Sequence, residues 1–205
     1  LGVEGLMAMG AIGGYYFGCK TNSMIVAILA AFLCAALGGL VYSFLTITFQ
    51  ANQNVTGLTL TIFGVGVYEF VGRSLTSGGK YPIMDDASQM AFMKSDIGIP
   101  VLRDIPYIGT LLFSYNIMVY ISVLVAVALW IYITKMKTGL KLRATGENYG
   151  AADACGVNVS LYRYMHTVCG AGITGLGGLY LGVVINGGAW NESWINGMGW
   201  ISVAL

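Results

Sequence analysis

The chain has 205 residues, of which 57% are hydrophobic and only 9% are charged, whereas about a quarter of the residues in a typical soluble domain are charged. This composition excludes a soluble globular protein and predicts one that lies in a lipid bilayer. The formal net charge of +1 also excludes nucleic acid as a partner, because the few scattered Lys and Arg residues cannot form the basic face that phosphate groups require.

Apolar runs of membrane-spanning length recur along the chain. A helix needs about 20 such residues to cross the hydrocarbon layer of a bilayer. We therefore predict an all-α, polytopic helical bundle with about five full spans and the start of a sixth near Trp194. We treat 1–205 as a single transmembrane domain and as a fragment of a longer chain. The five runs cover residues 2–18, 22–49, 55–72, 107–134 and 164–186.

The basic residues near the ends of these runs predict how the bundle is oriented. The polar segment 138–163 should be cytoplasmic, because basic residues favour the inner side of a membrane. The loop 73–106 should then lie outside, where acidic residues accompany its basic ones. The basic residues around the inner segment are Lys135, Lys137, Lys141, Arg143 and Arg163.

Small residues recur at helix-packing spacing in two of the runs. Gly10, Gly14 and Gly18 follow one another at intervals of four in the first run. Thr174, Gly178 and Gly182 repeat the interval in the fifth run. Small residues at this spacing let two helix backbones approach closely, so we interpret both rows as packing surfaces.

Polar residues within or beside the apolar runs are candidates for a path through the membrane. Glu4 is expected near the inner end of its helix and Glu69 near the outer end of the third. Carboxylates in such places serve either proton or cation relays or structural pairing. Asn52, Gln53 and Asn54 open the third run, and their amides could read solute hydroxyls or simply form a solvated turn.

Motifs for ATP binding and for hydrolysis are missing from the sequence. The nearest approach to an ATP-binding loop is Gly78-Gly79-Lys80, but Ser74 replaces its first glycine and Tyr81 its final hydroxyl residue. His166 is the single histidine and has no nucleophile motif around it. We expect no cofactor to bind this chain directly, and any ATP to be hydrolysed by a separate subunit.

Several strings together resemble the permease subunits of ATP-binding-cassette importers for simple sugars and nucleosides, which are related to ribose and branched-chain amino acid permeases. The strings include GVEGLMAMGA, ANQNVTGLTLTIFGVGV and IPVLRDIPYIGTLLFSYNIMVYI. The inner segment TGLKLRATGENYGAADACGVNV is similar to the family's Gly-Leu-x-x-Arg-Ala-x-Gly-Glu-Asn-Pro-x-Ala-Ala-Asp connector. It departs from that pattern at Tyr149 and Gly150, where Pro is usual.

The resemblance implies a transport function and a set of partners. It implies that the inner segment couples to an ATPase, that a second permease subunit and an extracytoplasmic solute-binding protein complete the importer, and that the assembly lies in the bacterial cytoplasmic membrane. Nucleosides are the first expectation for the solute and simple sugars the second. A branched-chain amino acid permease and an ion-coupled secondary transporter using Glu4 or Glu69 are the alternatives. The implied ATPase-coupling residues are Gly146, Glu147, Asn148, Ala151, Ala152, Asp153 and Gly156.

Overall fold

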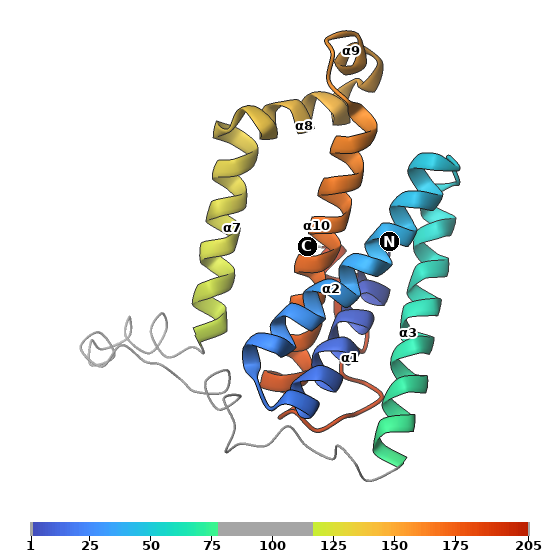
Figure 1. Cartoon of the computed structure of the whole chain (residues 1–205), viewed down its shortest axis with the longest axis vertical. Coiled ribbons are helices and arrows are strands. Elements are labelled where there is room, and N and C mark those ends of the chain that lie inside the picture. The colour runs from blue at the N-terminus through green and yellow to red at the C-terminus, as the bar shows by residue number, and fades with distance from the viewer. Residues whose placement is uncertain (1, 78–116, 205) are drawn as a thin grey trace, which may run out of the picture. The chain divides into compact units, whose positions relative to one another are not determined.

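The computed structural model describes residues 2–77 and 117–204. Their regular structure is helical, which confirms the all-α prediction (Figure 1). The chain forms two compact units, which are described separately below. The first contains residues 1–90 and 160–205, and the second contains residues 91–159.

The first unit is a bundle of long helices. Helices α2 and α10 each end in a short π-helical turn, η1 and η2, and two-residue or longer turns join the helices. Its elements are α1 (Val3–Thr21), α2 (Met24–Ser43), η1 (Phe44–Thr48), α3 (Gln53–Ser77), α10 (Val159–Tyr180), η2 (Leu181–Ile185) and α11 (Met198–Ala204).

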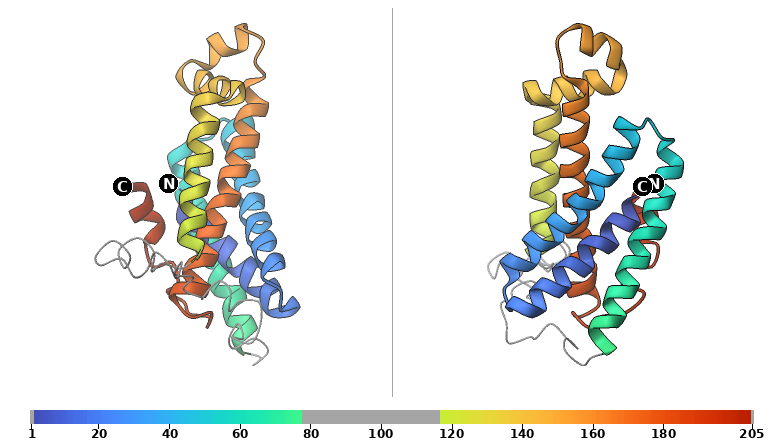
Figure 2. Two further views of the ribbon diagram at one scale, coloured as in Figure 1. Left: turned by 90° about the vertical axis from the view of Figure 1, so that its left-hand side faces the viewer. Right: turned by 45° about the vertical axis from the view of Figure 1, so that its right-hand side comes forward.

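Helix α1 lies at the centre of this bundle, between α2 and α3 (Figure 2). Glycines at its contacts allow the backbones of neighbouring helices to approach the backbone of α1 directly. A methyl group on Gly10 would lie 2.8 Å from the carbonyl carbon of Gly175 in α10, and one on Gly5 would lie 2.7 Å from the Cα of Thr61 in α3. The predicted packing role of Gly10 is therefore confirmed, and its partner in α10 is Gly175 rather than Thr174.

The outward faces of α2 and α3 are apolar and exposed. Leu29, Leu33 and Leu37 in α2 are 57%, 60% and 63% exposed, and Ile62 in α3 is 75% exposed. In water such a face would be costly, but in a bilayer it contacts lipid chains of the same polarity. The bundle is thus built around a glycine-lined interior and an aliphatic exterior.

Four helices in the described ranges are long and apolar enough to cross a membrane. The predicted count of five full spans and the start of a sixth is not confirmed. Helix α1 is not one of the four, and α11 begins at Met198, so Trp194 precedes that helix. The four candidate spans are Met24–Thr48, Gln53–Ser77, Met118–Lys135 and Val159–Ile185.

The second unit contains α7 (Ile117–Lys135), α8 (Lys137–Glu147) and α9 (Tyr149–Ala154). Met136 has extended backbone angles and separates α7 from α8. Gly139 lets α8 pack back on the end of α7, because a methyl group there would lie 2.7 Å from the Cα of Ile133.

Two predicted boundaries need correction. The outer loop was expected over 73–106, but residues 73–77 form the last turn of α3. The inner segment was expected over 138–163, but its last residues belong to α10, which begins at Val159. Residues 78–106 of the outer loop and 107–116 of the fourth run lie outside the described residues.

Candidate functional site

The predicted ATPase-coupling residues lie in and around helix α9, and local contacts define both ends of this helix. Asn148 precedes the helix in extended conformation, and its side-chain oxygen accepts a hydrogen bond from the Ala151 backbone N–H at 3.0 Å. This is an N-cap, which satisfies one of the free N–H groups of the first turn. The sequence-based expectation that Asn148 or a neighbour caps a short helix is confirmed.

The other end of α9 closes on Gly156. The Gly156 N–H donates to the Asp153 carbonyl at 2.8 Å, and the Val157 N–H donates to the Ala152 carbonyl at 3.1 Å. This pair of bonds is the Schellman motif, in which the residue after the C-cap is left-handed and usually glycine. Gly156 has φ +78°, a left-handed backbone conformation that glycine adopts without strain. The backbone conformation therefore explains why a glycine occupies this position of the predicted coupling residues.

The surface of α9 is exposed on all but one side. Glu147, Ala151 and Asp153 are exposed, and Tyr149 is 72% exposed. Ala152 is 5% exposed, so it faces the interior of the chain. The exposed part of α9 and the preceding Glu147, the last residue of α8, therefore together present two carboxylates, a small residue and an aromatic ring, while Ala152 is buried.

The amide-rich start of α3 has a structural role that partly accounts for its composition. The Asn52 side-chain oxygen accepts hydrogen bonds from the backbone N–H groups of Asn54, at 3.0 Å, and Val55, at 3.5 Å. Asn52 thus caps the start of α3. Gln53 and Asn54 are exposed beside it. As predicted, these three residues lie together at one helix end.

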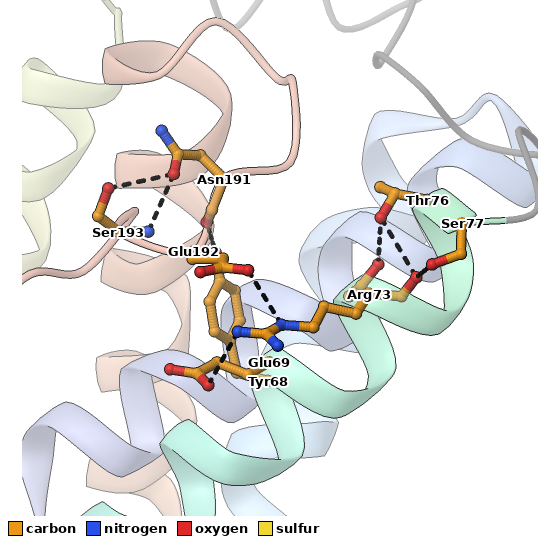
Figure 3. Close-up of polar contacts among 9 residues, drawn as sticks. Tyr68, Glu69, Arg73, Thr76, Ser77, Asn191, Glu192 and Ser193 are labelled. Carbon is orange, nitrogen blue, oxygen red and sulfur yellow. Dashed lines mark hydrogen bonds and ion pairs between the residues drawn. The ribbon is translucent and has the colours of Figure 1, made fainter.

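Glu69 lies on the surface toward the other end of α3, where it takes part in a small ion-pair network. Arg73 lies 3.9 Å from Glu69 and 3.0 Å from Glu192 (Figure 3). All three side chains are about half exposed. Glu69 is therefore one member of an exposed network, and pairs of this kind contribute little to stability.

Residues 186–197, which we call the re-entrant segment, connect η2 to α11 and run back along α3. The Tyr68 hydroxyl donates to the Asn191 carbonyl (Figure 3). The Trp190 ring packs on Gly72, and the Trp194 ring packs on Gly182. Irregular backbone at membrane depth is stable only where protein covers it, and these aromatic contacts supply that cover.

The aromatic contacts were missed by the sequence-based reasoning. Trp194 is 2% exposed and packs edge-on against Tyr15 with ring centroids 5.4 Å apart. Its indole N–H donates to the Ala189 carbonyl at 2.8 Å. The sequence analysis predicted that a spanning helix starts near Trp194 and therefore did not predict these packing contacts. The glycines at 187–188 and at 197 and 199 were a signal against that helix, because they break the helical pattern on both sides of Trp194.

Glu4 lies in the first turn of α1, and this turn packs beside the interior of α3. The adjoining Gly5 packs against Thr61 and Gly64 of α3. With a rise of 1.5 Å per residue, Thr61 is about 12 Å from the start of α3 and about 24 Å from its end. Glu4 is therefore at the end of its own helix, and that end lies opposite the interior of α3 rather than the start of α3; its expected place toward the inner side of the membrane stays a prediction.

The two Glu4 carboxylate oxygens have different surroundings. Oε1 accepts a hydrogen bond from the backbone N–H of Gly197 at 3.0 Å, across 193 residues of sequence. Oε2 is buried and accepts no hydrogen bond from any residue in the described part of the chain. The structure thus separates Glu4, in the interior, from Glu69, on the surface.

The comparisons with known proteins agree with these features. The whole chain, residues 1–205, matches the family described as branched-chain amino acid transport system / permease component, and the chain belongs to that family. With four helices of spanning length among the described residues, it is a multi-pass membrane protein. The resemblance found in the sequence is confirmed.

Three relatives align with the complete chain. It is 31% identical to the putative glucose ABC transporter permease protein TsgC13 of Haloferax volcanii and covers 60% of that protein. It is 29% identical to the nucleoside ABC transporter permease protein NupC of Lactococcus lactis, and 31% identical to the guanosine ABC transporter permease protein NupQ of Bacillus subtilis, covering 64% of each. The chain thus spans somewhat less than two thirds of these relatives. No solved structure matches it.

Proposed function

We propose that the chain belongs to a permease subunit in an ATP-driven importer of nucleosides or simple sugars. Three relatives named as glucose, nucleoside or guanosine permeases support this solute class. The observation that carries the coupling role is the geometry of α9, a six-residue helix capped at both ends and exposed at Glu147, Tyr149 and Asp153.

The physical reason is that a coupling element must keep its shape under load. A free helix of this length would not be stable in water, but the Asn148 cap and the Gly156 motif satisfy its terminal backbone groups from within the segment. A rigid-body movement of an ATPase subunit could then be passed on to α8 and α10, which flank α9 in sequence. Exposed side chains of α9 would enter a groove on that subunit, with Glu147 and Asp153 pairing at its rim.

The proposed assembly has several further members. Two cytoplasmic ATPase subunits would bind and hydrolyse ATP, and this chain would bind no cofactor itself. A second permease subunit, identical or homologous, would complete the path, and an extracytoplasmic solute-binding protein would deliver the solute. We place the assembly in the bacterial cytoplasmic membrane. Residues Asn52, Gln53, Asn54, Glu4 and Glu69 remain the proposed positions along the solute path.

The test reverses the charge of the exposed rim of α9. Glu147→Lys combined with Asp153→Lys should lower ATP-dependent uptake of labelled uridine at least tenfold and reduce co-purification of the ATPase subunit, because two ion pairs become repulsions. The control, Glu69→Gln combined with Glu192→Gln, removes two exposed carboxylates of the first unit. It should leave co-purification unchanged.

Both measurements use vesicles that hold the full permease, its ATPase and its receptor. Normal uptake by the Lys variant would refute the coupling role of α9. Competition by leucine, with no competition by glucose or nucleosides, would reassign the solute to branched-chain amino acids, as the family description suggests. Uptake that persists without ATP and stops when the ion gradient is dissipated would favour an ion-coupled transporter.

A further inference from the structure

The centre of the first unit contains a buried carboxylate oxygen whose hydrogen-bonding capacity is unused. A carboxylate accepts hydrogen bonds at both oxygens, but Glu4 Oε2 accepts none from the described residues. Enclosing a charged acceptor without a donor is unfavourable by an amount that usually excludes such groups from protein interiors. The oxygen is therefore expected to find a donor in another state of the protein.

The surroundings of Glu4 are built mainly from backbone. Gly5 and Gly64 bring α1 and α3 together on one side of it. On the other side, a methyl group on Gly199 would lie 2.6 Å from the Glu4 Cα. Glu4 is therefore enclosed by close backbone contacts, and its Oε2 accepts no hydrogen bond from the described residues.

The only described partner of the carboxylate is itself part of a separable segment. Gly197, which donates to Oε1, ends the re-entrant segment and has φ +82°. Asn196 before it also has positive φ, at 33°. These left-handed residues turn the Gly197 N–H toward Glu4. The segment contains no regular helix, and one backbone hydrogen bond joins its Gly197 to Glu4.

We propose that the Glu4 carboxylate is a solute contact inside the helical bundle, and that it accepts hydrogen bonds from the vicinal hydroxyl groups of a sugar ring. In the conformation described here, the re-entrant segment covers the carboxylate through Gly197. When the path opens, the segment moves away and the hydroxyl groups of the solute satisfy Oε2. This inference rests on the proposed function, and it names the residue that reads the sugar.

The chemistry of the carboxylate favours hydroxyl groups among the solute classes considered. Two carboxylate oxygens match the two donors of a vicinal diol, and an acidic residue that binds ribose hydroxyls in this way occurs in dinucleotide-binding proteins. No group of three or more acidic, His or Cys side chains suitable for a metal ion occurs in the described ranges. Glu4 therefore has no companion ligands there for a tightly held cation. A ribose in a nucleoside and a hexose both supply the diol.

The experiment compares paired solutes with and without the diol in vesicles that contain the full permease, its ATPase and its receptor. The solutes are uridine and 2′,3′-dideoxyuridine, with glucose and 2,3-dideoxyglucose as the hexose pair. Each solute is supplied bound to a saturating concentration of the receptor. The receptor's own preference among the solutes is then the same for every permease variant. The variants are Glu4→Gln, Glu4→Asp and the surface control Lys20→Gln, which removes an exposed charge from the last turn of the same helix.

The expected result is a change in the ratio between paired solutes. Loss of a hydrogen bond to a charged group should slow uridine transport by roughly tenfold to a hundredfold in Glu4→Gln. Transport of the dideoxy analogue should change by less than about threefold, because that solute never used the bond. Glu4→Asp should lie between Glu4→Gln and the original protein, and Lys20→Gln should match the original. A selective loss with the hexose pair instead would identify a hexose path.

Two outcomes would overturn the inference. If Glu4→Gln and Glu4→Asp slow both members of each pair equally, Glu4 only holds the re-entrant segment to α1. If neither variant changes transport, the carboxylate has no part in the path. Failure of the unmodified protein to carry either solute with ATP would instead refute the proposed function, and the inference would fall with it.

Discussion

A test of the packing around α1 compares two glycines of α3, Gly64 and Gly66. A methyl group on Gly64 would lie 2.6 Å from the Cα of Gly5, whereas one on Gly66 meets nothing within 4 Å. Carbon atoms in favourable contact lie about 3.5 to 4.0 Å apart. Gly64→Ala therefore forces α1 and α3 apart by about 1 Å, while Gly66→Ala requires no movement.

The difference in stability follows from these distances. Overpacking of a close contact costs about 1 to 3 kcal/mol, which lowers the melting temperature by roughly 2 to 10 °C for a protein of this size. Gly66→Ala should be neutral or raise stability by up to about 1 kcal/mol, because Ala favours a helix over Gly. Both variants replace Gly by Ala in the same helix, so their intrinsic helix preferences cancel.

The assay is the thermal unfolding of the full permease in detergent, followed by tryptophan fluorescence. Uptake measured at a low temperature, where both variants are folded, shows whether the altered packing also changes transport. Equal melting temperatures for the two variants would refute the reasoning, because they would mean that α1 and α3 do not meet at Gly5 and Gly64. A lower melting temperature for Gly66→Ala alone would mean that α3 faces α1 with the opposite side.

Two further substitutions test local features. Asn148→Ala removes the cap of α9 at a cost of about 1 kcal/mol and should weaken co-purification of the ATPase. Asn148→Asp, which also caps the helix, should leave co-purification unchanged. Equal losses of co-purification in both variants would show that the Asn148 amide itself contacts the partner. Arg73→Gln breaks two exposed ion pairs and should change the free energy of unfolding by less than about 1 kcal/mol. Thermal unfolding measures this change. A larger loss of stability would show that the ion pair with Glu192 holds the re-entrant segment in place.

Features that depend on residues close together in the sequence could be predicted from the sequence. Apolar runs predicted the long helices α2 and α3 within a few residues of their ends, because a spanning helix must satisfy its backbone internally and is recognised by its length. The capping of α9 was also foreseen, since Asn148 lies one residue before the helix that it caps. The confirmed resemblance rests on the same kind of contiguous pattern.

The depth of Glu4 was not accessible in this way. Its position follows from the contact of Gly5 with Gly64 and from the hydrogen bond to Gly197, both of which join residues far apart in the chain. A run of apolar residues does not show that its helix begins in the interior of the bundle. The sequence therefore indicated that Glu4 lies near one end of its helix, and only the contacts between helices showed that this end lies opposite the interior of α3.

The sequence by itself determined which segments become helices, how α9 is capped and which family the chain belongs to, because these properties are encoded by residues close together in the chain. Only the tertiary structure decided which glycines meet another backbone, where the re-entrant segment runs and what surrounds each carboxylate. Gly64 and Gly66 are the same residue type on different faces of one helix, and only the packing of α1 against the Gly64 face makes the two positions differ.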